Sequence, residues 1–95
     1  MDEVRDNREA SRFEIVRDGR LSVLQYRRRA TDIVLIHTEV PEALRGQGIA
    51  SLLAHGALTA ARAEGLPVVV ICPFVRAYLR RHPEMRTESV REERG

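Results

Sequence analysis

The amino-acid sequence predicts a mixed α/β (α+β) fold in which three strands are followed by a helix, a fourth strand and a second helix. Two observations lead to this prediction. Apolar runs of strand length stand on both sides of one long segment whose apolar residues recur with helical spacing. Glycine or proline separates most of these segments, which gives each of them an ordinary length. This order favours one mixed sheet with helices packed against it.

The first two predicted strands form a β-hairpin. The runs 13–16 (FEIV) and 21–26 (LSVLQY) are mostly apolar, and Asp18-Gly19 lies between them. This dipeptide is typical of the tight turns that join antiparallel strands. The third strand is predicted over 32–40 (DIVLIHTEV), whose middle is apolar on both alternating faces. Such a run indicates a central strand that is covered on both sides.

The main helix is predicted to start near Gly48 and to stop at Gly65, before Pro67. Residues 68–72 (VVVIC) then form a short buried strand. This strand is expected to run parallel to the strand before the helix, because a helix connects the two. Residues 74–82 are expected to form a second helix, which the next proline ends.

The chain has 95 residues and is expected to form one domain over residues 12–85. Residues 1–11 and 86–95 are charged and are predicted to be flexible tails. The N-terminal segment lacks the apolar stretch of a signal peptide, and no run is long enough to span a membrane. A single cysteine, Cys72, excludes an internal disulfide and suits a reducing compartment, so a cytoplasmic protein is expected.

The charge of the chain limits the classes of partner. The net charge is only +2, although all sixteen basic residues are arginines. We therefore expect neither nucleic acid nor a membrane as a partner, whereas a small anionic ligand is compatible with this balance. The run 27-RRR-29 is interpreted as a solvated strand end, and the alternative is that it attracts an acidic partner or a phosphate group. The histidines, the cysteine and the carboxylates do not have the spacing of a zinc site, so no metal is expected.

The stretch 44-LRGQGIASLL-53 places two glycines where the main helix begins. A helix start offers unpaired backbone N–H groups and a partial positive charge. Gly46 and Gly48 allow an anion to approach these groups closely, and Arg45 adds a charged donor. The turn is therefore predicted to hold a phosphate.

Two common phosphate-binding motifs do not fit this turn. A Walker loop needs a lysine, and the chain has none. A dinucleotide fingerprint that starts at Gly46 needs a third glycine at the position of Ser51. The pattern that remains is Arg45, two residues, Gly48, one residue and Ala50.

This pattern resembles the coenzyme A pyrophosphate loop of the GNAT acetyltransferase superfamily. The stretch 37-HTEVPEALRGQGIASLL-53 is similar to that loop with its preceding strand, and 68-VVVICPFVRAYLRRHPE-84 is similar to the strand and tyrosine-bearing helix that follow. Together they resemble a short, single-domain branch of the superfamily, marked by a His-Thr strand end and a Cys-Pro-Phe-Val…Tyr…His-Pro segment. The resemblance covers roughly residues 12–84.

The resemblance implies a fold and a cofactor, acetyl-CoA. Two parallel strands, which end at Val40 and Cys72, would splay apart and hold the pantetheine arm in the cleft between them. The pyrophosphate would lie on the backbone of the glycine turn. The cofactor-binding residues implied in this way are Val40, Arg45, Gly46, Gln47, Gly48, Ile49, Ala50, Cys72 and Phe74.

The resemblance also implies an activity, the transfer of an acetyl group from acetyl-CoA to an amine. The acceptor, a small molecule or a protein amine, is not identified. The chain lacks the two helices that usually cover the acceptor site, because a bare Asp18-Gly19 turn joins the first strands. The acceptor pocket is therefore shallow, shared with a second copy of a homodimer, or absent from a monomer. The alternative function is a non-catalytic CoA-binding or protein-interaction module.

Three residues are candidates for catalysis: His37, Cys72 and Tyr78. The position of the usual catalytic glutamate falls at Val34, which leaves His37 as the candidate base, with Glu39 on the same strand face. Tyr78 corresponds to the tyrosine that protonates the departing thiolate in the superfamily. Cys72 is either a nucleophile or a residue that lines the pocket. The alternatives for His37 and Tyr78 are a hydrogen-bonded strand end and an aromatic packed on its helix.

Overall fold

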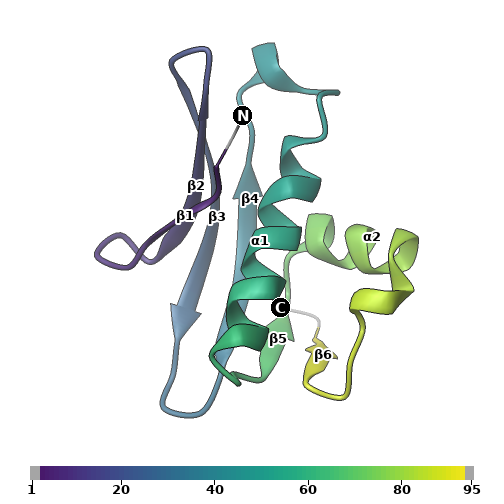
Figure 1. The fold of residues 1–95 in the computed structure, drawn as a ribbon. Helices are drawn as coiled ribbons and strands as arrows, with labels where there is room; N and C mark the ends of the chain where they lie inside the picture. The colour runs from purple at the N-terminus through teal and green to yellow at the C-terminus, as the bar shows by residue number, and fades with distance from the viewer. Residues whose placement is uncertain (1–2, 94–95) are drawn as a thin grey trace.

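The computed structural model describes residues 3–93 and shows one six-stranded sheet with two α-helices (Figure 1). The strands lie in the sheet in the order in which they occur in the sequence. Two short 3-10 turns, at Glu42–Leu44 and Pro83–Met85, precede α1 and follow α2. The bounds are β1 Arg5–Asn7, β2 Arg12–Arg17, β3 Arg20–Arg28, β4 Ile33–Glu39, α1 Ile49–Ala63, β5 Val68–Val70, α2 Pro73–Arg81 and β6 Val90–Glu92.

The sheet is mixed, as the sequence predicted. Strands β1 to β4 pair antiparallel, whereas β5 pairs parallel with β4 and with β6. The β2–β3 hairpin turns at Asp18 and Gly19, whose φ angles of 53° and 71° match the right-handed twist of a two-residue turn. The prediction of this hairpin and of the parallel pair is confirmed.

Strands β1 and β6 were not predicted, and they lie inside the segments expected to be flexible tails. Each has three residues, and most of these residues are charged or polar. Edge strands of this length carry no periodic apolar signal, because their pairing depends on backbone hydrogen bonds rather than on a buried face. The ends of the two predicted tails, residues 1–2 and 94–95, lie outside the described range.

Helix α1 begins at Ile49 and is followed by Gly65, in agreement with the predicted start and stop. Gly56, in the middle of the helix, has a packing role. A Cβ atom at this position would stand 2.7 Å from Cγ1 of Val4, which is closer than real contacts allow. The glycine therefore lets the segment that leads into β1 lie against the helix.

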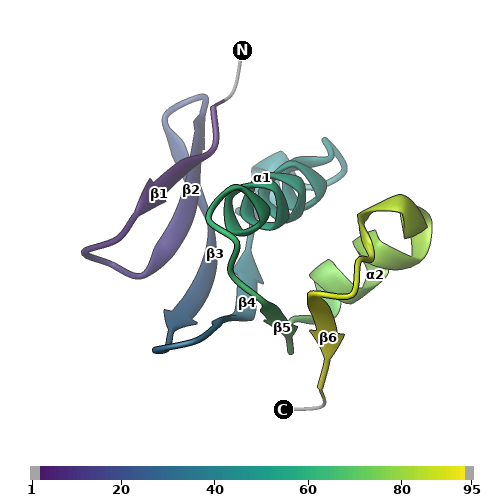
Figure 2. The same cartoon turned by 60° about the horizontal axis from the view of Figure 1, so that its bottom comes forward.

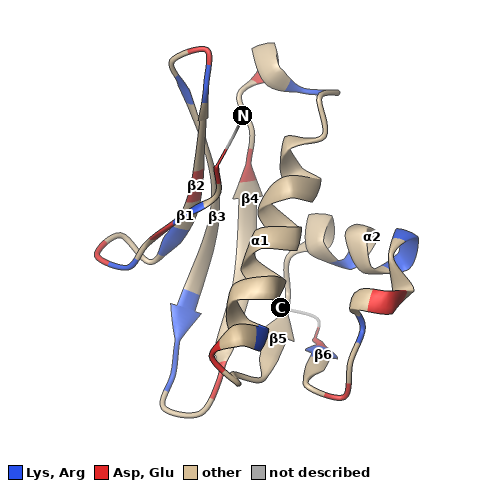
Figure 3. Cartoon of the chain, viewed as in Figure 1, with Lys and Arg blue, Asp and Glu red and all other residues tan. Residues whose placement is uncertain are grey.

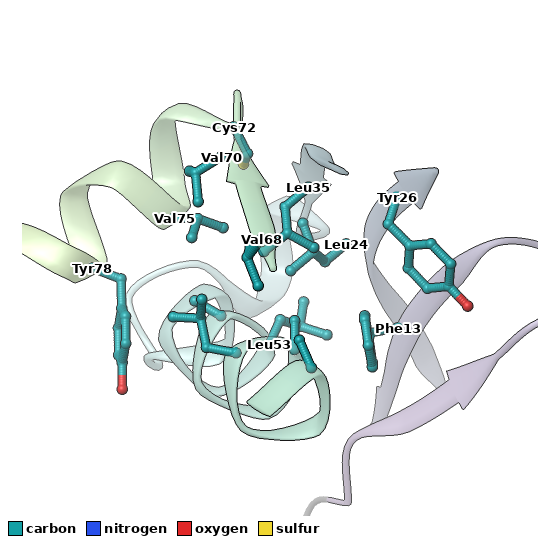
Figure 4. Packing of buried hydrophobic residues seen from close by; sticks show 14 of the residues in the cluster. Phe13, Leu24, Tyr26, Leu35, Leu53, Val68, Val70, Cys72, Val75 and Tyr78 are labelled. Carbon is teal, nitrogen blue, oxygen red and sulfur yellow. The ribbon is translucent and has the colours of Figure 1, made fainter. Parts of the chain in front are cut away.

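Both helices pack on one face of the sheet (Figure 2). Phe13, Leu24 and Leu35 on this face meet Leu53 of α1 and Val75 of α2 in one apolar core (Figure 4). The opposite face has no helix over it within residues 3–93. Strand β4 is nevertheless central in the sheet, and residues 33–35, which point alternately to both faces, are at most 6 % exposed, as predicted. Burial ends at Ile36, which is 36 % exposed.

A buried carboxylate lies on the face that carries no helix. Glu14 of β2 is 4 % exposed and accepts hydrogen bonds from Arg5 at 2.8 Å, Arg12 at 2.7 Å and Asn7 at 2.9 Å. The hydrogen bonds from Arg5 and then from Arg12 and Asn7 lower the pKa of Glu14 from 4.5 to about 2. These contacts fasten β1 to the sheet, and they explain why a charged segment is ordered here.

This carboxylate makes folding sensitive to acid. Because the pKa of Glu14 is lowered in the folded state, the ionised carboxylate stabilises the fold fully above pH 4.5. This contribution is lost as the pH falls from 4.5 towards 2. We expect Glu14→Gln to lower the free energy of unfolding by roughly 2 kcal/mol near neutral pH, and the difference from wild type to shrink in acid. Urea unfolding of the wild type and of Glu14→Gln at several pH values between 2 and 7 measures this difference in the free energy of unfolding. A difference that does not change with pH would contradict the prediction.

Two arginines of the run 27-RRR-29, Arg28 and Arg29, form ion pairs within the molecule. Arg28 contacts Glu64, the residue after α1, at 3.0 Å and Asp6 of β1 at 3.2 Å, and Arg29 binds Asp32 at 2.6 Å. These contacts join the end of β3 to α1 and β1, far along the strands from the glycine turn. The run lies at a strand end, as predicted, but Arg28 is held in ion pairs rather than solvated. Neither helix within residues 3–93 is long and apolar enough to cross a membrane.

Candidate functional site

The two parallel strands separate where they reach the glycine turn. Pairing between β4 and β5 ends at Leu35 and Val70. The carbonyl oxygen of Leu35 accepts hydrogen bonds from the N–H groups of both Ile71 and Cys72, at 2.9 and 3.1 Å, and the chain then turns into α2. The rest of β4 is paired only with β3. One backbone edge of residues 36–39 is therefore open within the described chain, which agrees with the predicted splay.

A bulge in β4 sets the direction of the side chains beyond this point. Gln25 of β3 lies opposite His37, but the next residue, Tyr26, lies opposite Leu35. Ile36 is thus the extra residue, and such an insertion bends a strand and re-aims the residues that follow it. His37 and Glu39 lie on the same side, with Nε2 of the histidine 3.3 Å from Oε1 of the carboxylate.

The separation of the strands opens a cleft of about 640 Å³. Its lining comes from the end of β4, from the turn before α1, from the first residues of α1 and from one residue of α2. The lining residues are His37, Thr38, Glu39, Val40, Leu44, Arg45, Gly46, Gly48, Ile49, Ala50, Ser51 and Phe74. The parts of β4 and β5 that pair with each other, residues 33–35 and 68–70, carry no charged side chain (Figure 3).

The glycine turn presents unpaired donors to this cleft. Gly46 and Gly48 have φ angles of 82° and 77°, a region that favours glycine. Gly48 caps α1, and the first helical hydrogen bond runs from Leu52 N–H to its carbonyl oxygen. No side chain caps the helix and no acidic residue occupies its first turn. The N–H groups of residues 49–51 are thus free to bind an anion.

The structure brings most of the predicted cofactor-binding residues together. Val40, Arg45, Gly46, Gly48, Ile49, Ala50 and Phe74 all line the cleft, as does the candidate base His37. Gln47 does not line it, because its side chain accepts a hydrogen bond from Arg17 of the hairpin at 2.9 Å. This contact ties the hairpin to the glycine turn.

Cys72 does not line the cleft itself but packs against a residue that does. Its side chain is fully buried, and the sulfur is 3.2 Å from the hydroxyl oxygen of Thr38, which does line the cleft. The thiol is therefore part of the packing between the strand ends, and Cys72 does not line the cleft as one of the two predictions had it. A role as nucleophile stays a prediction.

Tyr78 also lies outside the lining. Its ring is stacked on His82 with centroids 4.4 Å apart, and its hydroxyl group lies 3.0 Å from Nδ1 of His55 on α1. The hydroxyl points away from the apolar core and from Cys72 (Figure 4). Burial, and secondarily the nearby Glu84, raise the pKa of Tyr78, so the phenol remains protonated at neutral pH. Its role as an acid stays a prediction.

Sequence reasoning missed three residues of the cleft: Thr38, Leu44 and Ser51. Two of them carried a usable signal. Ser51 falls in the first helical turn after the glycine cap, and Thr38 stands between two residues already singled out. Leu44 lines the cleft because the 3-10 turn at Glu42–Leu44 folds back towards it, which no local pattern indicated.

Comparison with known proteins identifies this arrangement. The family model described as GCN5-related N-acetyl-transferase matches residues 12–88 of the chain. The chain belongs to the GCN5-related N-acetyltransferase family. Its mixed sheet, with the parallel pair β4–β5 and two helices, is a minimal form of the fold of this N-acetyltransferase family, as the sequence predicted.

Curated relatives match a shorter part of this N-acetyltransferase domain. The chain is 43 % identical over 49 residues to Protein NATD1 of Gallus gallus and of Mus musculus, which is 52 % of this chain and 44 % of each of those proteins. Protein NATD1 of Xenopus tropicalis is 41 % identical over 49 residues, or 52 % of this chain and 45 % of that protein. The chain spans less than half the length of these relatives in the matched region.

Proposed function

We propose that this chain is an N-acetyltransferase that uses acetyl-CoA and moves its acetyl group to an amine. One observation carries the proposal: free N–H groups at the start of α1 open into a cleft along the end of β4, beyond the point where β4 and β5 stop pairing. Membership of the family supports it, because enzymes of the superfamily use this cofactor in such a cleft.

The residues present fit the cofactor. A Cβ atom added at Gly46 or Gly48 would meet nothing within 4 Å, so the turn leaves room for a phosphate beside its backbone. Arg45 would supply positive charge, and the open edge of residues 36–39 would bind the amides of the pantetheine arm as a neighbouring strand does. Leu44 and Phe74 would form apolar walls.

Bound acetyl-CoA supplies a thioester whose carbonyl carbon an amine nitrogen attacks, with loss of the CoA thiolate. His37, which lines the cleft, would accept the proton of the amine. Glu39, whose Oε1 atom lies 3.3 Å from Nε2 of His37, would hold the ring in position. The acid proposed for the thiolate is Tyr78, which lies one helical turn from Phe74 of the cleft on the same face of α2.

The acceptor is proposed to be a small-molecule or protein amine that approaches the face of the sheet without helices. His37 and Glu39 are exposed, and no helix within residues 3–93 covers β4 on this side. A second copy of the chain would complete this wall in a homodimer. The same uncovered face favours one other candidate, a CoA-binding module without catalysis.

Calorimetric titration with acetyl-CoA tests the proposal, with ATP and NAD as control ligands. We expect selective binding of acetyl-CoA with a Kd on the order of micromolar, because the cleft offers both phosphate donors and a strand edge. Equal or absent binding of all three ligands would mean that the glycine turn only starts a helix. Binding without acetyl transfer to any of a panel of amines would favour the non-catalytic module.

A further inference from the structure

The seam between the two helices brings a cation to the mouth of the cleft. Nη2 of Arg81, in the last turn of α2, donates a hydrogen bond to Oγ of Ser51 at 3.2 Å. Ser51 lines the cleft and lies in the first turn of α1, next to the free N–H groups. The guanidinium thus reaches the glycine turn from an element 30 residues away in the sequence.

The surroundings of Arg81 leave its charge uncompensated. Many arginines of the chain are bound to carboxylates, as Arg28 is to Glu64 and Arg29 is to Asp32. Within residues 3–93, neither Arg81 nor Arg45 has a carboxylate within ion-pair distance. The nearby acid, Glu84, contacts His82 instead at 3.4 Å. The two arginines that border the cleft therefore share an excess of positive charge.

We propose that Arg81, positioned by Ser51, forms a phosphate-binding subsite on the α2 side of the cleft. The subsite rests on the proposed function, since its ligand is a phosphate group of CoA. The planar guanidinium would bind phosphate oxygens through its remaining N–H groups, and the Ser51 hydroxyl, which accepts from Arg81, would donate its own hydrogen to the same phosphate. CoA offers this chemistry twice, in its pyrophosphate and in its 3′-phosphate.

Calorimetric titration of Arg81→Ala with CoA and with 3′-dephospho-CoA tests the subsite. We expect the variant to bind CoA about ten-fold more weakly than wild type, because it loses one charge-assisted contact. If the subsite holds the 3′-phosphate, binding of dephospho-CoA does not change. If the subsite holds the pyrophosphate, binding of both ligands weakens to the same degree. Either result supports the subsite and identifies its phosphate.

Arg80→Ala is the matched control. Arg80 precedes Arg81 on the same turn but lines a different surface, beside Arg76, Glu92 and Glu93. The Arg80→Ala substitution removes the same charge from the same helix as Arg81→Ala. A purely long-range effect of charge would therefore weaken CoA binding equally in these two variants. Equal Kd values for the two variants would overturn the subsite.

A conservative variant separates the subsite from a structural role. Arg81→Lys keeps the charge but loses the planar fork, so its Kd for CoA is expected to lie between those of wild type and Arg81→Ala, with an unchanged melting temperature. If Arg81→Ala and Arg81→Lys both bind CoA with the Kd of wild type, the subsite is overturned while the proposed function remains intact. A wild-type protein that does not bind CoA would overturn the proposed function itself.

Discussion

Replacement of Gly48 by glutamate is expected to abolish the binding of acetyl-CoA, with a loss of affinity of at least about 100-fold. Gly48 caps α1 and lines the cleft, and a side chain built on it points into open space. A carboxylate there would occupy the free N–H groups of the first turn and repel the phosphates of the cofactor. Calorimetric titration of the variant with acetyl-CoA measures the effect.

Gly65→Glu is the control for this substitution. Gly65 also has a positive φ angle, 69°, and nothing within 4 Å of an added Cβ atom, but it lies beyond the other end of α1. Both variants carry the cost of a left-handed glutamate, about 1 kcal/mol, and both add one negative charge. We expect Gly65→Glu to bind acetyl-CoA as wild type does. Unchanged affinity in Gly48→Glu would mean that the cofactor does not use the glycine turn.

Replacement of His37 by glutamine is expected to lower kcat by about 100-fold while the Kd for acetyl-CoA stays the same, once an amine acceptor has been found. Glutamine retains polar atoms of similar reach but does not accept a proton at neutral pH. His37 is half exposed, so the substitution costs the fold little. Steady-state kinetics together with calorimetry separate the two quantities.

Two further variants divide the proposed roles around His37. Glu39→Gln keeps the hydrogen-bonding shape but removes the charge beside the imidazole, so we expect a smaller loss of kcat than in His37→Gln. Tyr78→Phe removes the proposed acid and is expected to reduce kcat without changing the Kd. A Tyr78→Phe protein with full turnover and only a lowered melting temperature would assign the hydroxyl to packing against His55. Full turnover in His37→Gln would exclude the histidine as base.

Elements with strong local signals could be predicted from the sequence. Asp18-Gly19 specified a hairpin because few other residues accept two left-handed conformations in succession. Gly48 and Gly65 placed both ends of α1, since each of them has a positive φ angle there. The glycine turn was predicted as part of the site for the same reason, because its geometry depends on residues that are adjacent in the chain.

Features that depend on distant contacts could not be predicted in this way. Strand β1 is ordered by Glu14, whose partners Arg5 and Arg12 have no distinctive spacing. The bulge at Ile36 follows from the register between β3 and β4, which the apolar run in β4 does not reveal. The same run predicted burial on both sides, which holds for residues 33–35 but ends at Ile36, where the bulge begins.

The sequence by itself determined the order of the elements from β2 to α2, the parallel strand pair and the turn that borders the cleft, since these follow from local backbone preference and from the length of a helical crossover. Only the tertiary structure decided which side chains meet. It placed Arg81 on Ser51 and Tyr78 on His55, turned Gln47 towards the hairpin and buried Cys72 behind Thr38. The physical reason is that a side chain's partner is set by the packing of α1 and α2 on one sheet face, and packing is a property of the whole chain.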